Sequence, residues 1–284
     1  MKITNKSGLP ASIIRAVTNQ THVGADYSAT QLLKSPRQLH LERRHDDEIE
    51  VDASERIWAM LGTAAHLVAQ FAEGEQDLVE TYMEQEVDGV TISGTADLYE
   101  HNTRTLTDFK NTSVWSIVYK SRMAEWSQQV NIYSWLLHKQ GFNAEKLQII
   151  AFLRDWQVTK AEHDPSYPQS NVVVIPIEKW EYHEVEDFIR MRVRVMESAA
   201  PVEDDDLPFC TDEERWKDET VYAVMKSGRK SAVKLHKNAM IAKKHTEDLG
   251  PDHYVQERPG VARRCGRYCM AAPFCNQKKM EDTE

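Results

Sequence analysis

The chain has 284 residues, and its 35 lysines and arginines against 45 aspartates and glutamates give a formal net charge of −10. Its 7 Trp, 7 Phe and 10 Tyr supply the apolar surface of a packed core, which excludes a disordered chain. No apolar stretch approaches the roughly 18 residues of a membrane span, and the start lacks an apolar signal core. We therefore expect a soluble, cytoplasmic protein with no membrane partner. The negative charge disfavours a sequence-independent nucleic-acid coat.

Residue periodicity predicts the elements of the first two thirds of the chain. In chain order they are a helix over 28–45 interrupted at Pro36, a helix over 54–72 with Ser54 as N-cap, strands over 79–87, 90–99 and 105–109 with turns at 88–89 and 101–102, a helix over 123–139 stopped by Gly141, strands over 147–153 and 172–177, and a helix over 178–198. This order predicts an α/β fold with a mixed central β-sheet flanked by helices.

The composition changes near residue 200. An acidic run over 203–206 marks a boundary, and residues 225–246 then hold seven lysines and arginines without one acid. The tail predicts strands over 221–224 and 232–235, a helix over 238–249, a strand over 254–257 and a group of cysteines. We expect an N-terminal segment (1–24), an α/β core (25–200) and a small basic, cysteine-bearing α+β subdomain (201–284).

Two carboxylates and a lysine are the most informative residues. A hairpin between the strands over 90–99 and 105–109 would bring Asp97 beside Asp108, a costly pairing unless a divalent cation lies between them. Oxygen ligands suit Mg²⁺ or Mn²⁺. Because side chains alternate along a strand, Asp108 and Lys110 share a face, and the lysine can orient a water for phosphodiester hydrolysis. A lone D-x-K triplet is common on exposed strands, so the residues around it decide whether it marks an active site.

Two helices supply those neighbours. His66 lies in the apolar helix over 54–72, and Gln129 and Tyr133 lie one turn apart in the helix over 123–139. Taken singly, a helix histidine is more often a core residue than a ligand, and a Gln–Tyr pair is more often packing.

Taken together, the ordered set G-x-x-x-H (62–66), G-x-x-D (94–97), D-x-K (108–110) and Q-x-x-x-Y (129–133) resembles the PD-(D/E)XK nuclease superfamily. The likeness is to its RecB-like exonuclease branch, which includes the AddB nuclease domain and the CRISPR-associated RecB-like exonucleases. Residues 27–42, YSATQLLKSPRQLHLE, are similar to the N-terminal helix of that branch. The likeness covers roughly residues 25–160.

The resemblance implies a role for each matched residue. His66, Asp97 and Asp108, with the main-chain carbonyl of Phe109, would ligate the catalytic metal. Lys110 would position the attacking water, Gln129 and Tyr133 would line the site, and the helix bearing Arg37 would lie near the path of the DNA strand. The family more often has Glu where this chain has Asp108, which affects the metal geometry and not the reaction class.

All four cysteines lie in the last third of the chain: Cys210, then Cys265, Cys269 and Cys275 in the spacing C-x3-C-x5-C. Four thiolates suit either zinc or an iron–sulfur cluster. Members of the branch often carry a 4Fe-4S cluster held by C-x2-C-x5-C and a cysteine near the N-terminal helix. Here Ser35 stands at that last position, so we expect Cys210 to be the fourth ligand, of a 4Fe-4S cluster first and of zinc as the alternative. Five basic residues around the cysteines would face phosphate or solvent: Arg263, Arg264, Arg267, Lys278 and Lys279.

These observations predict a Mg²⁺- or Mn²⁺-dependent DNA exonuclease of recombination, replication or repair that leaves 5′-phosphate and 3′-hydroxyl ends. Its partner would be single-stranded DNA or DNA ends, with recombination or replication proteins beside it. The short form resembles nucleases encoded by phages, which would act in the host cytoplasm. One alternative is an endonuclease of the same superfamily, and another is a non-catalytic DNA-binding accessory protein built on its cysteine module. The sequence does not predict the oligomeric state.

Overall fold

The computed structural model describes residues 1–18, 24–70 and 77–282, and the side chains of 65–70 lie outside that description. The chain divides into two units, one of residues 1–34 and 45–202 and one of residues 35–44 and 203–284. Within the described residues, no helix has the length and apolar character to cross a membrane. The predicted mixed α/β fold is confirmed.

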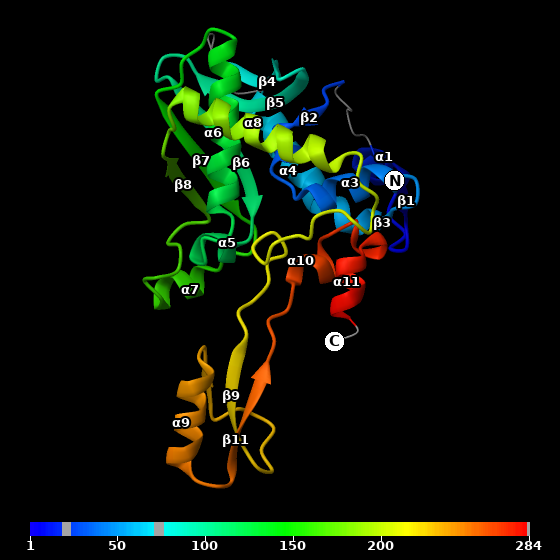
Figure 1. Cartoon of the computed structure of the whole chain (residues 1–284). Coiled ribbons are helices and arrows are strands. Elements are labelled where there is room, and N and C mark those ends of the chain that lie inside the picture. The colour runs from blue at the N-terminus through cyan, green and yellow to red at the C-terminus, as the bar shows by residue number, and fades with distance from the viewer. Residues whose placement is uncertain (19–23, 71–76, 283–284) are drawn as a thin grey trace. The chain divides into compact units, whose positions relative to one another are not determined.

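The first unit is built on a six-stranded mixed sheet (Figure 1). Its strands are β2 (Tyr27–Ser28), β4 (Leu78–Val87), β5 (Val90–Glu100), β6 (Thr105–Thr112), β7 (Lys146–Leu153) and β8 (Val172–Ile177). Its helices are α1 (Ala11–Thr18), α2 (Ala29–Leu32), α4 (Ile57–Gln70), α5 (Val114–Val118), α6 (Met123–Lys139), α7 (Val158–His163) and α8 (Tyr182–Ala199), with a 3-10 turn at Ala53–Arg56 before α4. A separate parallel pair joins β1 (Lys2–Thr4) to β3 (Glu50–Asp52).

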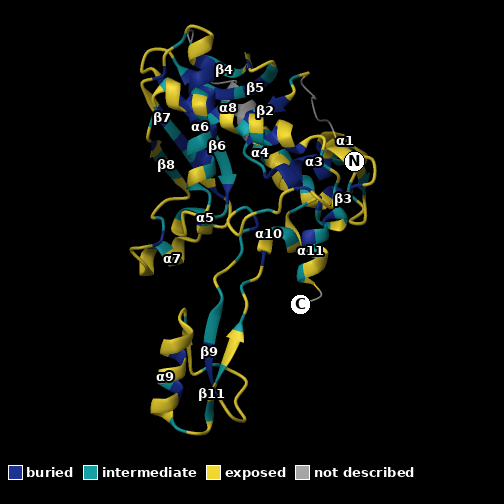
Figure 2. Cartoon of the chain, in the orientation of Figure 1, coloured by how far each residue is buried: buried dark blue, intermediate teal, exposed yellow. Residues whose placement is uncertain are grey.

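Strand β5 is the centre of this sheet. Strand β4 runs antiparallel along one edge of β5, while β2 and β6 pair with it at separate places, β2 at Ile92 and Ser93 and β6 over 98–100. Beyond β6, β7 is parallel and β8 antiparallel. Helix α6 packs on β4, β5, β6 and β7, and its buried face includes Trp126, Val130 and Leu137. The buried residues of this layer are concentrated on β5 and α6, whereas β4 and β8 are mostly intermediate or exposed (Figure 2).

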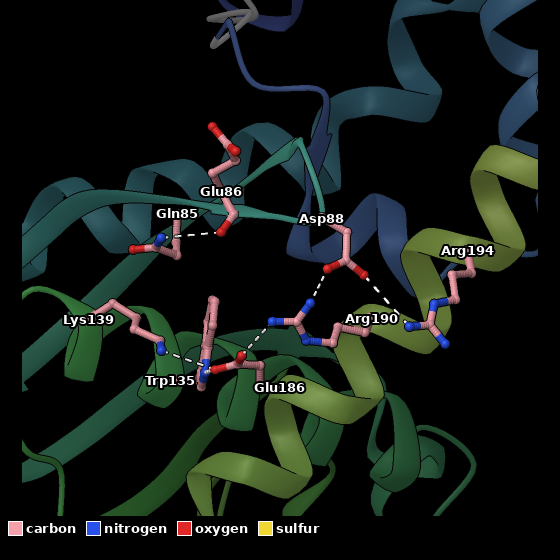
Figure 3. Close-up of polar contacts among 8 residues, drawn as sticks. All are labelled: Gln85, Glu86, Asp88, Trp135, Lys139, Glu186, Arg190 and Arg194. Atoms are coloured by element: carbon pink, nitrogen blue, oxygen red, sulfur yellow. Dashed lines mark hydrogen bonds and ion pairs between the residues drawn. The ribbon is translucent and has the colours of Figure 1, made fainter.

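The predicted turn at Asp88 and Gly89 is confirmed. Both residues have positive φ angles, 52° and 81°, the conformation that a two-residue hairpin with a type I′ turn requires. Figure 3 shows the Asp88 carboxylate paired with Arg190 of α8. Arg190 also contacts Glu186 at 2.8 Å, and Glu186 accepts a hydrogen bond from Lys139 of α6 at 3.0 Å. Arg190 and then Lys139 lower the pKa of Glu186 to about 2, so this ion network joins the turn to two helices.

The second unit holds α3 and the last third of the chain. Its elements are α3 (Pro36–Arg44), β9 (Val221–Lys226), β10 (Lys234–His236), α9 (Ala239–Leu249), β11 (His253–Arg258), α10 (Arg263–Arg267), a 3-10 turn at Ala272–Phe274 and α11 (Asn276–Glu281). The three strands form an antiparallel sheet in the order β10-β9-β11. The predicted tail elements are all present, each within two residues of its predicted ends.

Two helix starts differ from the predictions for physical reasons. The side chain that caps the start of the second helical segment is Asp52, which accepts the Ser54 N–H at 3.1 Å and the Ser54 hydroxyl at 2.6 Å, so Ser54 is not the cap. Helix α8 begins at Tyr182 and not at 178, because Glu181 and Glu184 form a capping box there.

Candidate active site

The two predicted carboxylates meet where β5 and β6 part. The ladder between these antiparallel strands ends at the pair Leu98–Thr107, so Asp97, the residue before Leu98 on β5, and Asp108, the residue after Thr107 on β6, lie just beyond it. Beyond it the Asp97 carboxylate takes the place of a ladder partner and accepts the main-chain N–H of Phe109 at 2.7 Å. Asp97 is 6% exposed and Asp108 2%. The hairpin therefore places both acids side by side in the interior, as predicted.

Lys110 joins these acids to α6 through three successive contacts. Its Nζ lies 2.7 Å from Asp108 Oδ2 and donates to Gln129 Oε1 at 2.9 Å. The Gln129 amide then donates to the Tyr133 hydroxyl at 2.7 Å. Four of the predicted residues are thus one continuous chain of polar contacts, and the ammonium has a fixed position.

The Tyr133 hydroxyl stays protonated in this setting. Burial raises the pKa of Tyr133, and the nearby Asp108 raises the pKa further. A neutral phenol fits a role as a hydrogen-bonding support for Gln129, because it adds no third negative charge beside the two aspartates.

Glu80 is an acid of the site that the sequence reasoning missed. The β4–β5 register passes from Val79–Leu98 to Thr81–Ala96, so Glu80 lies opposite Asp97. Its negative charge also adds to the raised pKa of Tyr133 on α6. The φ angle of Glu80 is 47°, uncommon for a residue with a side chain. Only the cross-strand register reveals this neighbour, and no local motif in the sequence marks it.

Gly94, the glycine of the G-x-x-D motif, is required by the packing of Tyr133. A Cβ at Gly94 would lie 2.7 Å from Tyr133 Cε1 and 3.0 Å from Leu136 Cδ1. We expect Gly94→Ala to cost about 1–3 kcal/mol in the free energy of unfolding, measured by urea denaturation. Gly62→Ala is the control, because no described atom lies within 4 Å of the Cβ it would add. Equal stability of Gly94→Ala and wild type would contradict this packing role.

The remaining predicted metal ligands are His66 and the carbonyl of Phe109. Helix α4, which carries His66, packs against β6, but the His66 side chain lies outside the described residues. Across the described part of the chain, no three His, Cys, Asp or Glu side chains form a group that could hold a metal ion. The donor chemistry at Asp97 and Asp108 nevertheless fits a divalent cation, since two buried carboxylates face a single ammonium.

The four cysteines line one small cavity of the second unit, together with Arg37 and Gln38 of α3. None of them is in a disulfide. Burial raises the pKa of the thiols of Cys210 and Cys265, and that of Cys269 to about 12, so these three thiols are neutral when no metal binds them. Ser35 Oγ lies 3.0 Å from Cys210 Sγ. Position 35, at which the sequence resemblance led us to expect a cysteine, therefore adjoins Cys210, the cysteine expected as the fourth ligand.

Arg37 is buried beside this cavity, at 1% exposure, so its own side chain does not reach the surface, and the path of DNA past its helix stays a prediction. Its guanidinium donates to the main-chain oxygens of Leu207 and Pro208 and to the side chain of Asn276, and Nη1 lies 4.0 Å from Cys275 Sγ. No described carboxylate forms an ion pair with it. A buried cation without a counter-ion is costly, and thiolates held by a metal would supply that negative charge. This environment fits an anionic metal–thiolate group.

Three of the five basic residues around the cysteines are engaged within the chain. Arg263 pairs with Asp218 at 2.8 Å, Arg264 donates to the carbonyl of Glu214 and lies over the Trp216 ring, and Lys278 pairs with Asp282. Arg267 and Lys279 are exposed. Most of this group is therefore explained by contacts inside the unit.

No sequence family and no curated protein matches the chain. Among solved structures, that of SSO0001 is similar with a TM-score of 0.45 and 16% identity, over 64% of this chain and 84% of that one. A phage-related exonuclease from Haemophilus somnus 129PT is similar with a TM-score of 0.30 and 13% identity, over 66% of this chain and 78% of that one. At this distance neither likeness assigns a role to a residue of this chain.

Proposed function

We propose that the protein is a Mg²⁺- or Mn²⁺-dependent deoxyribonuclease that acts as an exonuclease on DNA ends or single strands. The observation that carries this proposal is the chain of contacts from Asp108 through Lys110 and Gln129 to Tyr133, with Asp97 adjoining it. Buried acids beside a fixed ammonium are what hydrolysis of a phosphodiester needs, and the motif order resembles that of RecB-like nucleases.

Each residue has a defined part in this reaction. Asp97 and Asp108, with His66 and the Phe109 carbonyl, would hold the cation, which supplies positive charge to the scissile phosphate and lowers the pKa of a water. Lys110 orients that water by donating a hydrogen bond to its oxygen, while Gln129 holds the ammonium in place. Tyr133 fixes Gln129. Hydrolysis of the P–O3′ bond leaves a 5′-phosphate and a 3′-hydroxyl.

End-labelled linear DNA, single- and double-stranded, tests this function beside circular single-stranded DNA. An exonuclease releases label from linear substrates in the presence of Mg²⁺ or Mn²⁺ and leaves the circle intact. Cleavage of the circle would favour an endonuclease of the same superfamily. No cleavage of any substrate would overturn the proposal and favour the accessory DNA-binding protein.

For the cysteine cavity we propose a 4Fe-4S cluster bound by Cys210, Cys265, Cys269 and Cys275. The four thiols share one cavity with the buried Arg37 guanidinium, whose positive charge an anionic cluster would balance. Brown protein with absorbance at about 400 nm and bound iron is the expected result. Colourless protein with stoichiometric zinc would contradict the cluster and show a zinc site instead.

A further inference from the structure

A separate basic module lies between Cys210 and Cys265 in the chain. Residues 221–258, called the arm here, form the sheet of β9, β10 and β11 with helix α9 packed on it (Figure 1). The two segments that lead to it are joined by a bridge between Lys217 and Ala262 and by the N–H of Asp218, which donates to the Val261 carbonyl at 3.1 Å. The arm is thus tied at its base to the cysteine segment.

The arm carries the opposite charge to the rest of the protein. It has 8 lysines and arginines and 4 acids, a net charge of +4, so the other 246 residues carry −14. Seven of its basic residues fall within 226–244, all of them exposed: Lys226, Arg229, Lys230, Lys234, Lys237, Lys243 and Lys244. A positive surface on a strongly acidic protein attracts a polyanion and is not explained by solubility.

Most of these basic residues form no ion pair within the described chain, although Arg229 donates a hydrogen bond to the Ser231 hydroxyl. Lys237 forms an ion pair with Glu219 at 2.6 Å, and none of the other six pairs with a described carboxylate. The basic residues beside the cysteines differ, because most of them are held within the unit. The arm therefore presents six uncompensated charges to solvent.

One face of the arm sheet carries exposed side chains on its two outer strands, while Ala223 and Met225 of the central strand are buried there. His236 of β10 lies 2.9 Å from His245 of α9, ring nitrogen to ring nitrogen, so α9 covers the face on which His236 lies. Leu235 and Tyr254 lie on the other face and are 52% and 49% exposed. Figure 2 shows much of the arm surface as exposed. An exposed tyrosine side chain is a surface on which a nucleic-acid base can stack.

We infer that the arm binds the phosphodiester backbone of the DNA substrate. This inference rests on the proposed nuclease function, to which it adds a binding surface separate from the acids of β5 and β6. Lysine and arginine side chains bind phosphates by displacing condensed counterions, so the affinity they contribute falls with salt.

Fluorescence anisotropy with labelled single- and double-stranded oligonucleotides tests the inference, in full-length protein carrying Lys110→Ala so that the DNA stays intact. The arm variant combines Arg229→Ala, Lys230→Ala and Lys234→Ala. The control combines Lys2→Ala, Lys6→Ala and Arg15→Ala, which removes the same exposed charge from the first unit.

We expect the arm variant to bind about tenfold or more weakly at low salt. The slope of log K against log salt concentration should fall by about 2 to 3, since each lost phosphate contact contributes about 0.7 on single strands and 0.9 on duplex. The control should stay within twofold of the parent. Equal affinity and slope in the arm and control variants would overturn the inference, as would a parent that binds no DNA. Binding through the arm by a protein that cleaves nothing would leave the inference standing and overturn the nuclease function.

Discussion

Lys110→Ala is expected to lower kcat for DNA cleavage by about 10² to 10³-fold, the usual cost of removing one positioned hydrogen-bond donor from an active site. The ammonium is held between Asp108 and Gln129 at 2.7 and 2.9 Å, so no other described lysine can replace it in that geometry. The loss should appear in kcat, with KM nearly unchanged, because the role proposed for the lysine is to orient the attacking water and not to bind DNA.

Controls separate this catalytic loss from a loss of folding. Lys146→Ala removes an exposed lysine from the neighbouring strand β7 and should retain wild-type kcat. Thermal unfolding followed by circular dichroism should show Lys110→Ala folded at the assay temperature. Asp108→Asn, which removes the negative charge of a proposed metal ligand and keeps the side-chain shape, should be at least as inactive. Cleavage by folded Lys110→Ala at the wild-type rate would contradict the role given to this residue.

Much of this site could be predicted because its signals are local. The Asp-Gly pair fixes the β4–β5 turn, the period of two puts Asp108 and Lys110 on one face, and the spacing of Gln129 and Tyr133 is one helical turn. Each of these relations lies within a few residues of sequence, where backbone geometry allows few conformations.

The relations that could not be predicted connect distant segments. Glu80 joins the site only through the β4–β5 register, and the need for Gly94 appears only when Tyr133 packs on it. Helix α3 was expected in the core, yet it belongs with the cysteines, where Arg37 is buried. Periodicity states which face of a helix is buried, and it does not state against which partner.

The contact between Ser35 and Cys210 gives a second strong prediction. Cys210→Ser should remove most of the bound iron together with the absorbance of the cluster at about 400 nm, or most of the zinc if the site holds zinc. Three cysteines leave one coordination position without a thiolate. Adding Ser35→Cys to that variant should restore the larger part of both, since the Ser35 oxygen lies 3.0 Å from the Cys210 sulfur.

The swap requires a control for non-specific rescue. Ser227→Cys in the Cys210→Ser background adds a thiol on the exposed loop after β9, far along the chain from the cavity, and should restore neither metal nor colour. Full metal content in Cys210→Ser alone would show that Cys210 is not a ligand. Failure of Ser35→Cys to rescue would show that position 35 does not reach the group. Rescue would mean that a ligand can move between two residues 175 positions apart in the chain, because the fold places them side by side against the same buried arginine.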